Sequence, residues 1–117
     1  MRLKSSIWVK AYVRRCAVAG AMAYVVRHGD DDAGAIFLRV SRLDGSTMLF
    51  GPAPAGLTTL GGDRHWTRLG PAAAMTDEEA DVLLRREIGF DSDLWIVEVE
   101  DREGRHFLAD QLSGESG

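Results

Sequence analysis

A stripe of large apolar side chains in residues 5–19 places the strongest limit on how this chain folds. At 100° per residue, one helical face carries Trp8, Val9, Tyr12, Val13 and Cys16. We expect Ser5 or Ser6 to cap the start of this helix and Gly20 to end it. A helix with such a stripe has to bury it against another element, so the rest of the chain must supply a packing surface.

Runs typical of β-strands follow directly. "MAYVVR" (22–27) and "AIFLRVS" (35–41) are rich in branched and aromatic residues, and the polar stretch 28–34 between them predicts a turn. Asp44-Gly45 is a strong short-hairpin signal that leads into "TMLF" (47–50). Three successive strands joined by short polar turns predict an antiparallel meander.

The middle of the chain breaks this pattern. Residues 51–63 hold two prolines and four glycines, which is typical of a long surface loop, and "RHWTRL" (64–69) follows as a fourth strand. The second helix is expected over 76–88, because Thr76 and Glu79 have the spacing of a capping box.

Two further strands are expected at 94–100 and 105–109, joined by a turn that closes at Gly104. The predicted fold class is therefore α+β, with an antiparallel sheet of about five to six strands and two packed helices in the order αββββαββ. We assign 1–109 to a single domain and 110–117 to a flexible tail.

Composition fits an ordinary globular domain, with 117 residues of which 45% are hydrophobic. Cys16 is the only cysteine, so no internal disulfide or multi-thiolate zinc site can form, and we expect it to be a small buried hydrophobe. Basic residues interrupt every apolar run near the start, so the chain is expected to be cytoplasmic without membrane insertion. An arginine-rich, acid-free start also resembles an organellar transit peptide, the less favoured alternative.

Charge is unevenly distributed along the chain. Residues 1–29 hold six Lys and Arg and no acidic residue, whereas the remainder holds eight basic and eighteen acidic residues. The basic side of the first helix, with Lys10, Arg14 and Arg15, either lies against the acidic part of the same chain or meets an anionic partner.

The stretch "HGDDDAG" (28–34) is the first candidate for chemistry. Asp30, Asp31 and Asp32 carry oxygen ligands suited to calcium or magnesium, but adjacent side chains splay apart, whereas a calcium loop alternates its ligands. We therefore interpret the stretch as a turn with local backbone hydrogen bonds, and expect no metal and no cofactor.

Each of the three histidines follows an arginine. If 105–109 pairs with 94–100, His106 lies beside Glu98 and Glu100, where it could act as a general base. A small hydrolase that uses His65 or His106 with these glutamates or with Asp30–Asp32 is accordingly one alternative function.

RNA binding is a second alternative. Arg64, Trp66 and Arg68 would share one strand face, and interleaved cations and aromatic rings can grip phosphates and stack on bases. The net charge of −4 is opposite to the usual basic footprint, so nucleic acid is disfavoured as a partner.

Three stretches resemble a known family: "MRLKSSIWVKAYVRRC", "DAGAIFLRVSRLDG" with "LFGPAP", and "FDSDLWIVEVEDREGRHFL". Together they resemble the bacterial domain-of-unknown-function family 1491, which consists of short uncharacterised single-domain proteins. The resemblance covers nearly the whole chain. It implies no established activity, so no catalytic residue is transferred from it.

The leading hypothesis is a non-enzymatic binding or adaptor module that recognises a protein or another anionic partner. It rests on the uneven charge and on the lack of a catalytic constellation, and a homodimer through a free edge strand is a further alternative. The residues predicted to bind the partner or anion are Lys10, Arg14, Arg15, Arg64, His65, Trp66, Arg68 and His106.

Overall fold

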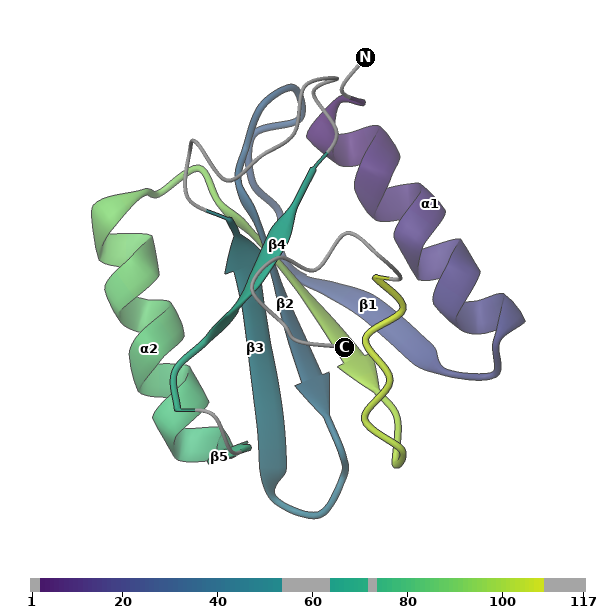
Figure 1. Cartoon of the computed structure of the whole chain (residues 1–117). Helices are drawn as coiled ribbons and strands as arrows, with labels where there is room; N and C mark the ends of the chain where they lie inside the picture. The colour runs from purple at the N-terminus through teal and green to yellow at the C-terminus, as the bar shows by residue number, and fades with distance from the viewer. Residues whose placement is uncertain (1–2, 54–63, 72–73, 109–117) are drawn as a thin grey trace.

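Two helices and six strands form the part of the chain that the computed structural model describes, residues 3–53, 64–71 and 74–108 (Figure 1). In chain order they are α1 (Ser5–Val18), β1 (Met22–Arg27), β2 (Ile36–Ser41), β3 (Ser46–Pro52), β4 (Trp66–Leu69), β5 (Met75–Thr76), α2 (Asp77–Phe90) and β6 (Trp95–Glu100). Most of the predicted loop 51–63 and the predicted tail 110–117 lie outside the described residues. No described helix is long and apolar enough to cross a membrane.

The strand order in the sheet is β1-β6-β2-β3-β4, with the short β5 paired to β3. The last of the described strands, β6, therefore lies between the first two, antiparallel to β1 and parallel to β2 (Figure 1). This corrects the prediction of an antiparallel sheet, because the β2–β6 pair makes the sheet mixed. The hairpin predicted at Asp44-Gly45 is confirmed, since β2 and β3 pair antiparallel around a turn in which Gly45 has φ +89°.

The length of the connection after β1 explains why the predicted meander is wrong. Eight residues separate Arg27 from Ile36, which is more than a tight hairpin uses and enough to cross the width of one inserted strand. β2 is buried on both faces except at Arg39, as expected of an interior strand. The sequence of β2 shows that it is an interior strand, but it does not show which strand pairs with each of its edges.

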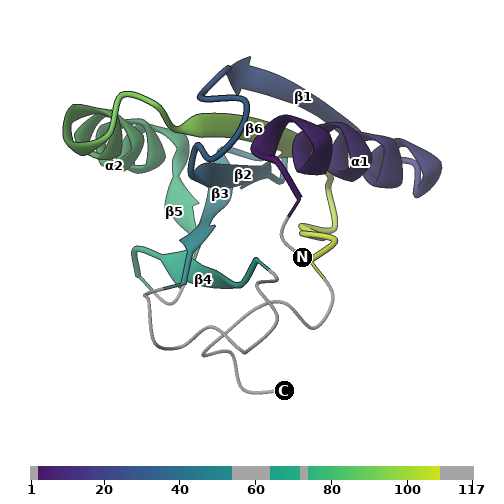
Figure 2. The same cartoon turned by 90° about the horizontal axis from the view of Figure 1, so that it is seen from above.

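The two helices cover opposite faces of the sheet (Figure 2), and each encloses its own core. The α1-side core includes Val9, Tyr12, Leu38, Val97 and Val99. The α2-side core includes Phe37, Leu49, Ala80, Leu84 and Ile96. Odd and even positions of β6 thus serve different cores, as the period of two requires.

The predicted apolar face of α1 is confirmed, with Trp8, Val9, Tyr12 and Cys16 buried. Cys16 is fully buried, and burial raises the pKa of its thiol. The predicted serine cap is wrong, because Lys4 is the N-cap residue and makes no side-chain cap.

The start of α1 is satisfied by the loop after β1 instead. The backbone N–H groups of Ser5 and Ser6 donate to the carbonyls of Asp32 and Asp31. The Ser5 hydroxyl donates to the Gly34 carbonyl over 2.6 Å. The loop therefore supplies the acceptors that a capping side chain supplies in other helices.

The start of α2 follows the prediction. Thr76 accepts a hydrogen bond from the Glu79 backbone N–H, and the Glu79 carboxylate accepts one from the Thr76 N–H, which completes the capping box. Arg39 of β2 ties this helix to the sheet, because its guanidinium contacts both Asp77 and Asp81.

The predicted strand at 105–109 is wrong where the structure describes it, through residue 108. Both edges of β6 are already occupied, by β1 and β2, so no strand can pair there. The chain turns away instead: the Asp101 carboxylate accepts from the Arg105 backbone N–H and guanidinium, and Phe107 adopts a φ of +57°. The Tyr12 hydroxyl donates to the His106 carbonyl, which anchors this segment to α1.

The Asp101–Arg105 contact predicts a pH dependence of stability. Hydrogen bonds from Arg105 lower the pKa of the Asp101 carboxyl below its usual value of about 3.9. The contact therefore stabilises the fold above that pH and is lost as the pH falls below it. We expect Asp101→Asn to lower the thermal midpoint at pH 7 by a few degrees, with the difference from wild type shrinking below about pH 4.

Thermal unfolding followed by circular dichroism measures this difference, with Glu103→Gln as the matched control. Glu103 is exposed and lies 3.7 Å from the same guanidinium, so its neutralisation should leave the midpoint unchanged. A difference between D101N and wild type that is the same at pH 3 and pH 7 would rule out the proposed role of the carboxylate.

Candidate functional site

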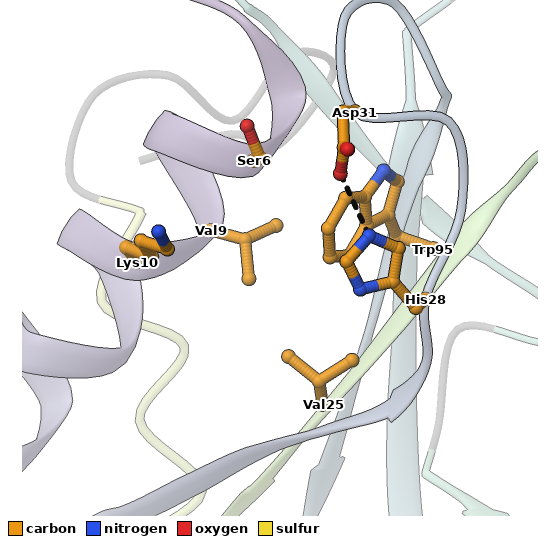
Figure 3. A pocket seen from close by; sticks show the side chains of 7 residues that line it. All are labelled: Ser6, Val9, Lys10, Val25, His28, Asp31 and Trp95. Carbon is orange, nitrogen blue, oxygen red and sulfur yellow. Dashed lines mark hydrogen bonds and ion pairs between the residues drawn. The ribbon is translucent and has the colours of Figure 1, made fainter.

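A pocket of about 360 Å³ lies between α1 and the end of β1 (Figure 3). It is lined by Ser6, Val9, Lys10, Val25, His28, Asp31 and Trp95. Val9, Val25 and Trp95 give it an apolar floor. The other four side chains place a hydroxyl, an ammonium, an imidazole and a carboxylate around it, and this combination is typical of ligand pockets.

A β-bulge in β1 turns His28 toward this pocket. Val25 pairs with Val97, which belongs to the α1-side core, whereas Arg27 pairs with Ile96, which belongs to the α2-side core. In a regular strand Val25 and Arg27, two positions apart, would face the same side of the sheet. Here they face opposite sides, so Val26 is an additional, unpaired residue that forms the bulge. The reversal of alternation leaves His28 on the α1 side of the sheet.

His28 is held by two contacts there. Its ring lies against the Trp95 ring, with centroids 4.0 Å apart, and its Nε2 is 2.7 Å from the Asp31 carboxylate. The Trp95 indole N–H donates to the Asp30 carbonyl, so the tryptophan is fixed as well. The imidazole is therefore oriented by its surroundings, although about two thirds of its side chain is exposed.

The loop 28–34 is shaped by close approach to the chain before β6. A Cβ on Gly29 would lie 2.2 Å from the Asp93 carbonyl oxygen, and one on Gly34 would lie 2.5 Å from it. The Asp30 carboxylate accepts hydrogen bonds from the backbone N–H groups of Asp32 and Ala33. This confirms the prediction that the stretch forms a turn with local hydrogen bonds, although the turn arches over β6 and does not close a hairpin.

No group of three or more His, Cys, Asp or Glu side chains stands close enough to hold a metal within the described ranges. In this loop, Asp30 is engaged by backbone N–H groups, Asp31 by His28, and Asp32 by Lys4 at 3.6 Å. The three aspartates therefore have three different partners.

The basic residues of α1 differ in whether they contact the rest of the chain. Arg15 donates to the Phe107 carbonyl and so holds the C-terminal segment. Lys10 and Arg14 are exposed and form no ion pair with any described residue. They lie one turn apart on the same side of the helix, and Lys10 lines the pocket.

The predicted binding residues around β4 lie mostly in the interior. Trp66 is 1% exposed and packs against Trp8, with ring centroids 4.9 Å apart. Arg64 is buried and donates to the Leu3 carbonyl and the Ser5 hydroxyl. These two side chains support the start of α1, so Trp66 offers no free ring face for a base.

The other residues predicted in this region do not extend the pocket. His65 lies beside Pro52 in a small crevice, and Arg68 is half-buried in β4. Neither residue lines the pocket at α1.

The pairing of His106 with Glu98 and Glu100 that one form of the hydrolase hypothesis requires is not formed among the described residues. His106 packs edge-on against Phe50 in the α1-side core, with centroids 5.2 Å apart. Glu98 and Glu100 lie on the opposite face, where a carboxylate oxygen of each lies 3.0 and 2.9 Å from the Tyr24 hydroxyl, whose single proton is donated to one of them at a time. Partial desolvation and the hydrogen-bonding contacts with these two acids raise the pKa of Tyr24. The predicted neighbourhood of His106 and the glutamates is wrong because residues 105–108 do not form a strand.

Most of the residues around the pocket were not predicted as binding residues from the sequence. Of the seven lining residues, Lys10 alone was predicted to bind a partner, whereas His28 and Asp31 were assigned to a turn, with Asp31 also named in the hydrolase alternative. The paired Gly29 and Gly34 are the one local signal that could have indicated a close backbone approach at this place.

Comparison with known proteins gives a consistent result. The model of the family described as "Protein of unknown function (DUF1491)" matches residues 3–109. A crystal structure of a DUF1491 family protein from Caulobacter crescentus CB15 is 38% identical, with a TM-score of 0.78 over 99% of this chain and 100% of that one. The solution structure of protein Atu0922 from A. tumefaciens is 42% identical, with a TM-score of 0.73 over 86% of each chain. No curated protein matches the chain.

The close approach at Gly29 predicts a specific sensitivity. Because the nearest atoms to an added Cβ are backbone atoms of Asp93 and Leu94, we expect Gly29→Ala to reduce the free energy of unfolding by about 1–3 kcal/mol. Gly89→Ala is the matched control, since a Cβ there meets nothing within 4 Å and alanine favours the helix by about 0.5–1 kcal/mol. Urea unfolding measures both, and a G29A variant as stable as wild type would contradict this packing.

Proposed function

Because the chain belongs to the DUF1491 family, whose description names no activity, we propose from its geometry that it is a non-enzymatic binding module. Its ligand is an acidic segment of a partner protein that carries an apolar side chain. The observation that supports this most strongly is the position of Lys10, an exposed cation at the wall of an apolar-floored pocket.

The two cations on α1 favour this kind of ligand, while the carboxylate in the pocket lining, that of Asp31, is engaged by His28. Lys10 and Arg14 present two cations along one side of α1, with no ion pair to any described residue. Carboxylates of a bound segment would pair with them, while its apolar side chain enters between Val9 and Val25. The hydroxyl of Ser6 and the His28–Asp31 pair at the rim supply hydrogen-bonding groups for the backbone of such a segment.

The expected strength of these contacts is modest. Burial of one apolar side chain is worth about 1.5–3 kcal/mol, and each exposed ion pair adds about 0.2–1 kcal/mol. Before the cost of association, one side chain and two ion pairs together contribute about 2–5 kcal/mol, a range that includes the roughly 4.1 kcal/mol of a millimolar dissociation constant. Tighter binding therefore requires contacts beyond the pocket and the two cations.

Selection of displayed peptides against the immobilised protein tests the proposal. We expect the selected peptides to combine Asp or Glu with one large apolar residue, and their affinity to fall several-fold when salt is raised from about 50 to about 200 mM. The double variant Lys10→Glu/Arg14→Glu should lose at least about tenfold in affinity for them, as measured by fluorescence anisotropy.

Arg85→Glu/Arg86→Glu is the matched control, because it makes the same charge change at two exposed arginines of α2. It should bind the selected peptides as wild type does. Peptides without acidic residues, or equal losses in the two double variants, would refute the proposal.

A further inference from the structure

The outer edge of β1 lies near the pocket and, among the described residues, pairs with no strand, just as Lys10 and Arg14 form no ion pair with them. In the described part of the chain, β1 pairs with β6 alone and forms one end of the sheet (Figure 2). Its large side chains remain exposed to an unusual degree: Met22 is 63% exposed, Val26 53%, Val25 42% and Tyr24 39%. A six-residue edge strand with such side chains is a ready template for another strand.

The devices that commonly protect an edge are few here. β1 contains no proline, lysine or acidic residue, and its single charge, Arg27, lies at the end and donates to the Ser92 carbonyl. The bulge at Val26 is the one protective irregularity, and it leaves Met22–Val25 in regular register with β6. Four consecutive residues therefore offer a regular edge.

We propose that the acidic segment binds as an extra strand on the outer edge of β1. This inference rests on the proposed function and specifies how the segment is held. Val25 lines the same pocket as Lys10, so alternate side chains of an added strand would face Lys10 and Arg14 on the α1 side. The other side chains would pack beside Met22 and Tyr24, on the face that lies opposite α1.

Charge complementarity selects this occupant over a second copy of the chain. Two copies paired antiparallel through β1 are related by a two-fold axis perpendicular to the sheet, which puts both α1 helices on the same face. The unpaired cations of Lys10 and Arg14 would then approach those of the partner copy, and like charges at an interface disfavour association. A foreign acidic strand meets the same cations with opposite charge.

Backbone pairing also supplies the affinity that the pocket and two cations lack. Strand addition gives a series of main-chain hydrogen bonds along the edge, while the pocket and the cations determine which sequences are accepted. The ligand is accordingly an extended segment in which acidic and apolar residues alternate.

Peptides methylated on the backbone nitrogen test this inference. The probe is an acetylated, amidated decapeptide in which Glu and Val alternate, and two further forms carry N-methyl groups on either the odd or the even residues. In an added strand only alternate N–H groups point toward the partner. We expect one methylated form to lose at least about tenfold in affinity and the other to bind within about threefold of the parent.

Amide hydrogen exchange provides the second readout, in which binding should slow exchange within residues 22–27. A block isomer, with the five glutamates before the five valines, is the control of equal composition and should bind more weakly than the alternating peptide. Equal binding of all three alternating forms would overturn strand addition.

The outcomes separate the two proposals. If both methylated forms bind equally and Lys10→Glu/Arg14→Glu still abolishes binding, strand addition is wrong and the acidic-segment proposal stands. If the parent decapeptide fails to bind at low salt while selected acidic peptides bind, strand addition is wrong and the acidic-segment proposal stands. Sedimentation without peptide tests whether a second copy occupies the edge instead. A concentration-dependent dimer that Val26→Lys removes would assign the edge to a second copy. Val82→Lys is the control, because Val82 is about as exposed as Val26, and it should leave such a dimer intact.

Discussion

The pairing of β6 with two neighbours at once is the interaction on which the rest of the structure depends. As the last of the described strands, it joins β1 on one side and β2 on the other, so the sheet is complete only when residues 95–100 are in place. Its alternating side chains build both cores, with Val97 and Val99 under α1 and Ile96 under α2. Long-range pairing of this kind is not encoded by any local signal.

The pocket is a consequence of the same insertion. The chain after β1 must cross the start of β6 to reach β2, and the loop 28–34 makes this crossing in close contact with the Asp93 carbonyl. The crossing brings His28 onto Trp95 and presents the carbonyls of Asp31 and Asp32 to the first turn of α1. A single loop thereby satisfies a helix start, covers a buried tryptophan and forms one wall of the pocket.

Local chemistry explains which features could be predicted from the sequence. The stripe on α1, the Thr76–Glu79 capping box and the hairpin at Asp44-Gly45 each depend on neighbours within four residues, and each is present. The strand predicted at 105–109 failed because both edges of β6 were already taken, which only the strand order reveals. The bulge at Val26 has no sequence mark, since Val-Val is an ordinary strand dipeptide.

The predicted binding residues divide for a similar reason. Arg64 and Trp66 combine cation and aromatic ring in a pattern that also occurs in nucleic-acid sites, yet here they pack beneath the start of α1. Lys10 and Arg14 remain exposed, so the charge asymmetry noted in the sequence indicated a feature that the fold leaves at the surface. The family resemblance is confirmed by the match over residues 3–109. Because that family has no described activity, the functional argument rests on the geometry of this chain.

The position of a bound segment tests the central claim most directly. Selective labelling of the valine methyl groups would allow intermolecular nuclear Overhauser effects to be measured in the complex with a selected acidic peptide. Contacts from the peptide to the methyl groups of both Val9 and Val25 are the predicted result, because both side chains line the pocket. The account would be contradicted if the peptide contacted only Val82 on α2, or if it contacted none of the labelled valines.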